Sequence, residues 1–242
     1  MRVADNGIFN DEKAAVKYAS QHASGNTPVY AIIFPEANNF LSELAVAGYQ
    51  KFMEGDTLGL ANATQLTKDV LKTYGQSGLE IDAHSRGSLT FTNAAESIKN
   101  ESNSKGALGN TYVNFYGPAQ NVANADSVVA YLQNRDAITD PTQKTKMSIQ
   151  YQTHTADPIG TLIGLNPSTG GTIPEGSSIL WEGIRAATGR ENTAHNLYYK
   201  DVSNFQPKEE LKQRINLIDQ YWGGQTPKLV PAIDYTAQGG NK

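Results

Sequence analysis

Ser85 lies in the pentapeptide AHSRG, whose residue types suit a catalytic serine. A serine hydroxyl becomes a nucleophile when a base removes its proton, and acyl transfer also needs N–H donors for the developing oxyanion. A sharp turn between a strand and a helix meets both needs when the residues two before and two after the serine are small. Ala83 and Gly87 occupy these positions, so the sequence predicts a nucleophile at Ser85, projecting from the end of a strand.

An acid and a histidine follow Ser85 in the chain order Ser, Asp, His, which is the order that accompanies a serine on this kind of strand-to-helix turn. Asp157 comes just after a predicted strand, on the same sheet edge as Ser85, and only His195 among the histidines follows Asp157. His84 and His154 fit the base role less well. We expect His84 to point away from the serine and pack beside the turn, and His154 to lie on a strand surface or at the rim of the site.

Alternating strand and helix patterns surround these residues. Strands are predicted at 29–34, 79–84, 111–117 and 146–154, and helices at 11–23, 40–74 (in two pieces), 86–100, 121–133 and 207–222. The strand at 29–34 is apolar on both faces, which is typical of the middle of a sheet. Because parallel neighbours need crossover connections, the alternation predicts an α/β fold with a mostly parallel central sheet and helices on both faces. Ligands then bind at the C-terminal edge of that sheet.

We divide the chain into an N-terminal helical segment (1–26), one α/β domain (27–222) and an irregular C-terminal tail (223–242). Within the domain, the Gly-, Pro- and Ser-rich stretch 163–178 is interpreted as an exposed loop, forming a lid or rim. A chain of 242 residues with 38% hydrophobic residues is sufficient for one such packed domain.

The composition excludes several kinds of protein. The 20 Lys and Arg residues against 24 Asp and Glu, with no dense basic run, argue against nucleic acid as the partner. The absence of cysteine excludes disulfides, thiolate catalysis and cysteine-based zinc sites. No apolar stretch is long enough for a signal peptide or a transmembrane segment, so we expect neither, and export would depend on something outside this chain.

Four segments resemble the lipase-like α/β-hydrolases, in particular those of the class 3 type. They are DAHSRGSLT (82–90), VNFYGPAQN (113–121), HTADPIGTL (154–162) and AHNLYY (194–199), in the family's order. The resemblance implies an α/β-hydrolase fold with a Ser85–Asp157–His195 triad. Ser85 would attack an ester carbonyl, His195 would act as general base and then acid, and Asp157 would orient and stabilise the imidazolium.

The same resemblance implies an oxyanion hole. One donor would be the backbone N–H of Arg86, and the other would come from Glu36 or Ala37 in the loop FPEANN that follows the strand at 29–34. Arg86 stands where the family commonly has an apolar residue, which points to a polar or anionic head group nearby. The implied reaction is hydrolysis of carboxylic esters by a lipase, phospholipase or esterase, with no metal or other cofactor.

The segment NGIFNDEKAAVKYA (6–19) is similar to segments in the C-terminal regions of filamentous-haemagglutinin and contact-dependent growth-inhibition exoproteins. The variable C-terminal domains of those proteins are toxins. This similarity implies an effector that is secreted, or delivered into a target cell, as part of a larger protein. It would act on acyl lipids of a competitor's membrane through peripheral contact, and a cognate immunity protein would be its partner.

Two other functions stay open. A metal-dependent nuclease-type toxin would use His84, His154, His195 and Asp157 as ligands. A non-catalytic module for binding or entering a target cell would keep a hydrolase scaffold without its reaction, and would use the loop 164–178 for contact. Taken singly, Asp157 also fits an Asx turn and His195 a surface histidine.

Overall fold

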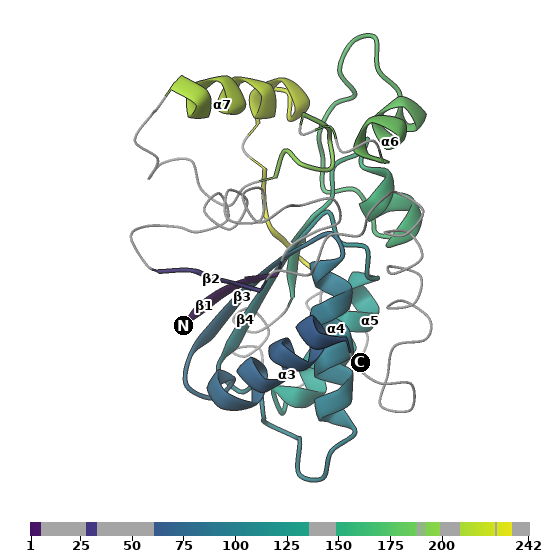
Figure 1. Cartoon of the computed structure of the whole chain (residues 1–242). Coiled ribbons are helices and arrows are strands. Elements are labelled where there is room, and N and C mark those ends of the chain that lie inside the picture. Colours follow the sequence, from purple (N-terminus) through teal and green to yellow (C-terminus); the bar gives the residue numbers. More distant parts are fainter. Residues whose placement is uncertain are drawn as a thin grey trace, which may run out of the picture.

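The computed structural model describes residues 1–5, 28–32, 61–135, 149–187, 190, 192–198, 209–225 and 227–233. Its strands are β1 (Arg2–Asp5), β2 (Tyr30–Ile32), β3 (Leu79–His84), β4 (Thr111–Tyr116), β5 (Gln150–Gln152) and β6 (Val230–Pro231). Its helices are α3 (Asn62–Tyr74), α4 (Gly87–Lys99), α5 (Val122–Leu132), α6 (Ile179–Ala187) and α7 (Glu209–Tyr221), with a π-helical turn, η1 (Ile159–Ile163). Figure 1 shows their arrangement.

The six strands form one sheet in the order β2-β1-β3-β4-β5-β6. Neighbours from β2 to β5 are parallel, and β6 runs antiparallel to β5. The prediction of an α/β fold with a mostly parallel sheet is confirmed. Because β3 and β4 pair in register up to His84 and Tyr116, the C-terminal ends of β3, β4 and β5 share one edge of the sheet.

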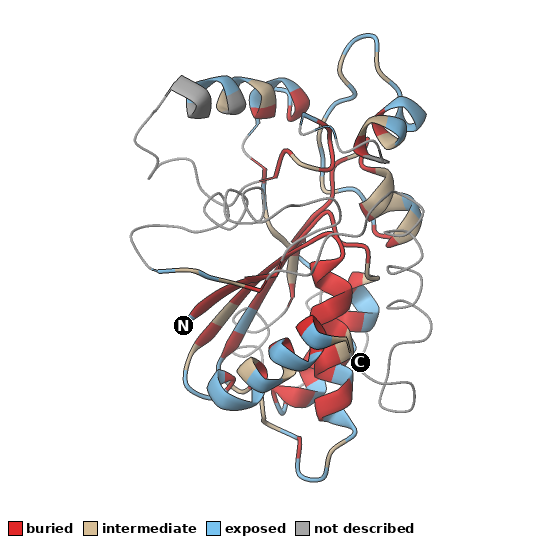
Figure 2. Cartoon of the chain, in the orientation of Figure 1, coloured by how far each residue is buried: buried red, intermediate tan, exposed pale blue. Residues whose placement is uncertain are grey.

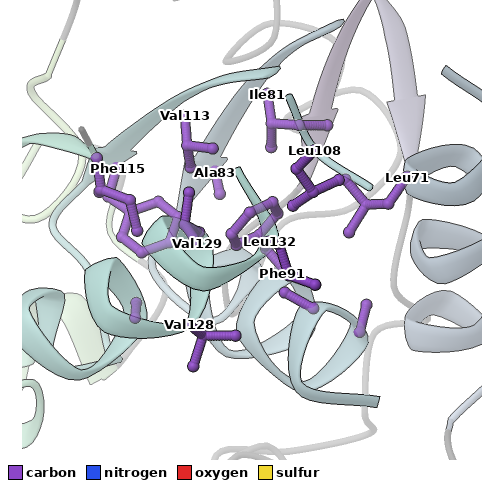
Figure 3. Close-up of a cluster of buried hydrophobic side chains, with 14 of the residues drawn as sticks. Leu71, Ile81, Ala83, Phe91, Leu108, Val113, Phe115, Val128, Val129 and Leu132 are labelled. Carbon is purple, nitrogen blue, oxygen red and sulfur yellow. The ribbon is translucent and has the colours of Figure 1, made fainter. Parts of the chain in front are cut away.

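One face of the sheet packs against α3, α4 and α5. The apolar side chains of this core alternate along β3 and β4 and meet side chains from the three helices (Figure 3): Ile81, Ala83, Val113, Phe115, Leu71, Phe91, Val128, Val129 and Leu132. Phe91 and Phe115 meet edge to face, with ring centroids 5.7 Å apart. Burying each large side chain contributes about 1.5–3 kcal/mol, so this core holds the strand ends in place. Figure 2 shows the buried residues along β3, β4 and α4.

The other face of the sheet carries buried charge. Arg2 forms a hydrogen-bonded ion pair with Glu80, and its Nε lies 3.6 Å from Asp82 Oδ2. Asn114 Nδ2 donates to Asp82 Oδ1 at 2.8 Å. Polar residues thus occupy the alternate positions of β3 and β4, opposite the apolar core. The helix predicted at 11–23, the first of the two pieces within 40–74 and residues 146–148 lie outside the described residues.

Three expectations about the sheet were wrong. Residues 2–5 form β1 between β2 and β3, instead of belonging to a separate N-terminal helical segment, and the Met1 ammonium donates to Gly78 O at 2.8 Å. β2 stands at the end of the strand order and Tyr30 is 60% exposed, so it is not a central strand of the described sheet. The tail contributes the short strand β6, which pairs with β5.

The prediction of a long exposed loop after residue 162 needs a smaller correction. The stretch 163–178 is largely without helix or strand, but α6 follows it directly at Ile179. Its inward-facing Glu182 is completely buried. None of the helices in the described ranges combines the length and the hydrophobicity that spanning a bilayer requires.

Asp5 ends β1 as a completely buried carboxyl group beside α3 and α4. Burial raises the pKa of Asp5 to about 8, an effect that the Thr67 hydroxyl opposes. A carboxyl group with a higher pKa in the folded than in the unfolded chain binds its proton more tightly when folded. Its ionisation therefore removes stability as the pH rises from about 4 to about 8.

We expect Asp5→Asn to flatten this pH dependence. The free energy of unfolding of the variant, measured by denaturant titration, should exceed that of the wild type by an amount that grows from pH 4 to pH 8 and then levels off. The growth should reach several kcal/mol, because each pKa unit corresponds to about 1.4 kcal/mol. Asp219→Asn, at an exposed position on α7, is the control and should give a parallel curve. A parallel curve for Asp5→Asn would contradict the assignment.

Candidate active site

Ser85 occupies a strained turn between β3 and α4. Its φ is +53°, in the left-handed region that side chains other than glycine avoid at about 1–2 kcal/mol. Its backbone N–H donates to Tyr116 O at the end of β4, at 2.9 Å. The Ser88 hydroxyl donates to Ser85 O at 2.7 Å and accepts from Gln120 N–H. The surrounding chain therefore holds the strained conformation in place.

The small residue two positions after Ser85 has a structural reason. A Cβ at Gly87 would lie 2.6 Å from the carbonyl oxygen of Asp5, since α4 begins directly against β1. Glycine here lets the helix start within one residue of the turn. The N-terminus of α4, with its partial positive charge, then lies directly after Ser85.

Asp157 and His195 meet at the same edge of the sheet. Asp157 follows β5, and His195 belongs to the segment 192–198, which we call the base loop. His195 Nδ1 lies 2.9 Å from Asp157 Oδ1, and both side chains are buried. Asp157 Oδ1 also accepts the N–H of Ile159 at 2.9 Å, at the start of η1.

This contact sets the tautomer of His195. When Nδ1–H donates to the carboxylate, the neutral ring presents a lone pair at Nε2, as a general base must. His195 Nε2 and Ser85 Oγ are both buried, and neither has a hydrogen-bond partner among the described residues. One is an acceptor and the other a donor, on adjoining parts of the same edge. Nucleophile–base contacts are often long before substrate binds.

The negative charge of Asp157 is well supported. Burial raises the pKa of Asp157, but His195, the Tyr198 hydroxyl and the backbone at Gly160 more than offset this effect, and the pKa lies below its usual value. Tyr198 donates to Asp157 Oδ2 at 2.6 Å. Burial and the charge of Asp157 raise the pKa of Tyr198 well above its ordinary value, so its hydroxyl remains a donor.

His84, at the end of β3, contacts His195. Its ring stacks on that of His195, with centroids 4.9 Å apart and planes 28° from parallel. His84 Nε2–H donates to the His195 carbonyl oxygen at 2.8 Å. His195 is therefore held at its ring by Asp157 and at its backbone by His84.

Known families, curated proteins and solved structures offer no match to this chain. Function is therefore inferred from the site itself.

His154 lies near the site but is occupied structurally. Its Nε2–H donates to Tyr221 O at 2.7 Å, and its Nδ1 accepts the N–H of Ala156 at 3.0 Å. Burial lowers the pKa of His154, consistent with a neutral ring. No group of three or more potential metal ligands gathers anywhere in the described part of the chain. His154 thus has no nitrogen available as a base or ligand in this arrangement.

Of the three residues expected to form the oxyanion hole, the structure describes one, Arg86. Arg86 directly follows Ser85 at the start of α4, and its side chain is almost completely buried within the protein. Glu36 and Ala37 lie outside the described residues. The strand that precedes them, β2, is separated from β3 by β1.

Gly117 and Tyr198 are site residues to which sequence reasoning gave no role, although the resembling segments contained both. Gly117 follows β4 with a φ of +51°, and its N–H donates to Gln152 O. A Cβ there would lie 2.6 Å from Asp157 Oδ2 and 3.1 Å from His195 Nδ1. The acid and the base therefore pack directly on the bare backbone of Gly117.

We expect Gly117→Ala to reduce turnover by about 100-fold or more, because displacement of a catalytic group by about 1 Å has an effect of this size. Gly176→Ala is the matched control: Gly176 also has a positive φ, of +78°, but a Cβ there meets nothing within 4 Å. Backbone strain should lower the free energy of unfolding of both variants by a similar amount, about 1–2 kcal/mol. Ester turnover and unfolding free energy, measured on both, separate the two effects; equal turnover would contradict the expectation.

Proposed function

We propose that this protein is a serine hydrolase of the α/β-hydrolase type that cleaves carboxylic esters. The observation that carries the proposal is the complementary pair of buried, unpartnered atoms, Ser85 Oγ and His195 Nε2, beside a carboxylate that fixes the tautomer of His195. The strained φ of Ser85 adds support, because backbone strain of this kind is found at functional sites.

The reaction would follow from these groups. Ser85 Oγ attacks the ester carbonyl carbon while its proton moves to His195 Nε2, and the carbonyl oxygen becomes an oxyanion. The N-terminus of α4, beginning with the Arg86 N–H, is the proposed partner of that oxyanion. His195 then protonates the leaving alcohol as the C–O bond breaks. Water, deprotonated by His195, releases the acid from the acyl-enzyme and restores Ser85.

The segment of the chain between Asp157 and His195 supports a substrate with an apolar part. Seven large hydrophobic side chains of the segment 162–184 are exposed: Leu162, Leu165, Ile173, Ile179, Leu180, Trp181 and Ile184. Large exposed hydrophobic side chains, where they gather into a patch, mark binding sites. An acyl ester or phospholipid suits it better than a small polar ester. Delivery into a target cell and a cognate immunity protein stay predictions from the sequence.

Incubation with a fluorophosphonate, followed by intact mass and peptide mapping, tests the proposal. This reagent reacts with serine hydroxyls that are activated by a base. We expect one adduct on the wild type, located at Ser85, and none on Ser85→Ala. A folded wild type that gains no adduct would reject the serine mechanism. Metal analysis and partner capture would then test the nuclease and the binding module.

A further inference from the structure

Glu182 is a completely buried carboxylate outside the triad. It lies on α6, and its Oε2 accepts the backbone N–H of Ala194 at 2.9 Å. Ala194 immediately precedes His195 in the base loop and is itself fully buried. The base loop has no helix or strand hydrogen-bonding pattern of its own, so side-chain contacts must hold it.

The remaining contacts of Glu182 tie three parts of the chain together. Its Oε1 accepts from the Ser177 hydroxyl at 2.6 Å, and the Tyr221 hydroxyl of α7 lies 3.3 Å from both oxygens. Arg185 places Nη1 3.3 Å from the same carboxylate and donates from Nη2 to Asn192 O at 2.7 Å. α6 therefore contacts the base loop at two backbone positions, through a carboxylate and a guanidinium.

We propose that Glu182 is a positioning residue for His195, fixing the backbone on its N-terminal side. This inference rests on the proposed function. His195 would then be held from three elements: Asp157 after β5 holds its ring, His84 of β3 holds its carbonyl, and Glu182 holds the preceding N–H. Loss of the Glu182 oxygens leaves the Ala194 N–H without its acceptor, and a shift of the loop carries Nε2 away from Ser85.

Four variants test this role: Glu182→Ala, Glu182→Met, Glu182→Gln and the control Glu175→Ala. Met preserves the buried volume but offers no hydrogen-bond acceptor. Because apolar replacements of buried charged groups are often tolerated, the Met variant serves if Glu182→Ala does not fold. Gln keeps an oxygen for the Ala194 N–H. Glu175 is an exposed glutamate in the stretch that precedes α6.

On a soluble short-chain ester we expect Ala and Met to lower kcat by about 10 to 100-fold with little change in KM. Gln should retain most of the wild-type kcat, and Glu175→Ala all of it. We expect the wild type to show a downfield proton NMR resonance from the His195 Nδ1–H, and this resonance should broaden or disappear in the Met variant and persist in the Gln variant.

A folded Met variant with wild-type kcat and an unchanged resonance would overturn the proposal. So would a Gln variant as impaired as Met, because positioning requires only an acceptor at Oε2. A wild type that a fluorophosphonate does not label would instead reject the proposed function, and the inference with it. The two failures are therefore distinguishable in one series of samples.

Discussion

Replacement of Ser85 by Ala should abolish ester hydrolysis, and replacement by Gly should do so while stabilising the protein. Both variants lack the hydroxyl that would form the acyl-enzyme in the proposed reaction, and loss of a nucleophile removes most of the acceleration that a triad provides. The φ of +53° at this position is costly for Ala as it is for Ser, but glycine adopts it freely. We therefore expect Ser85→Gly to be about 1 kcal/mol more stable than Ser85→Ala.

The measurement pairs turnover of a soluble ester with denaturant unfolding of the wild type and both variants. Asn103, with a φ of +59° in the connection between α4 and β4, provides the comparison. Asn103→Gly should gain similar stability and keep full activity. A Ser85 variant that retains turnover would remove Ser85 from the reaction. A Gly variant no more stable than Ala would show that the turn is not strained.

Replacement of Asp157 by Asn should lower kcat by about 10⁴-fold while preserving the backbone. The amide has the shape of the carboxylate but lacks the charge that stabilises the imidazolium. In the wild type, one carboxylate oxygen accepts a hydrogen bond from the His195 Nδ1–H and the other from the Tyr198 hydroxyl. The NH₂ group of Asn would have to face one of these two donors. If the NH₂ faces His195, the ring is driven into the tautomer that cannot accept the proton of Ser85.

Asp126→Asn is the matched control. Asp126 is equally buried, accepts the N–H of Ile149 at 2.9 Å and lies 3.6 Å from Arg135 Nη2, far from the triad in the chain and on α5. We expect this variant to lose stability and to keep its kcat. Steady-state kinetics on both, with circular dichroism to verify folding, distinguish a catalytic acid from a buried structural one. A kcat of Asp157→Asn within tenfold of the wild type would contradict the assignment.

Hydrophobic periodicity predicted several secondary-structure elements correctly, and chain order helped to pair two residues of the candidate site. The strand at 79–84 matches β3, and the helices predicted at 86–100 and 121–133 match α4 and α5 to within a residue or so. Apolar and polar residues alternate along β3, and α4 ends just before Asn100. Asp157 and His195 were paired from chain order, from the position of Asp157 after a predicted strand and from the family resemblance, and the structure brings them into hydrogen-bond contact.

What the sequence did not reveal depends on long-range contacts. β1 is four residues long and begins with Arg2, whose burial makes sense only beside Glu80, 78 positions later. Residues 2–5 were not predicted as a strand, so the position of β1 between β2 and β3 was missed. Glu182 received no role from the sequence patterns. Only the folded chain shows that it reaches the backbone beside His195.

Because the strands are parallel, Met1 and Ser85 lie at opposite edges of the sheet. The Met1 ammonium bonds to Gly78 O at the start of β3, and Ser85 follows the end of the same strand. Six residues of strand, about 20 Å, separate the two. A linker, label or carrier domain joined ahead of Met1 would therefore leave from the edge of the sheet opposite Ser85. Immobilisation at Met1 should leave the edge that carries Ser85 turned toward solution.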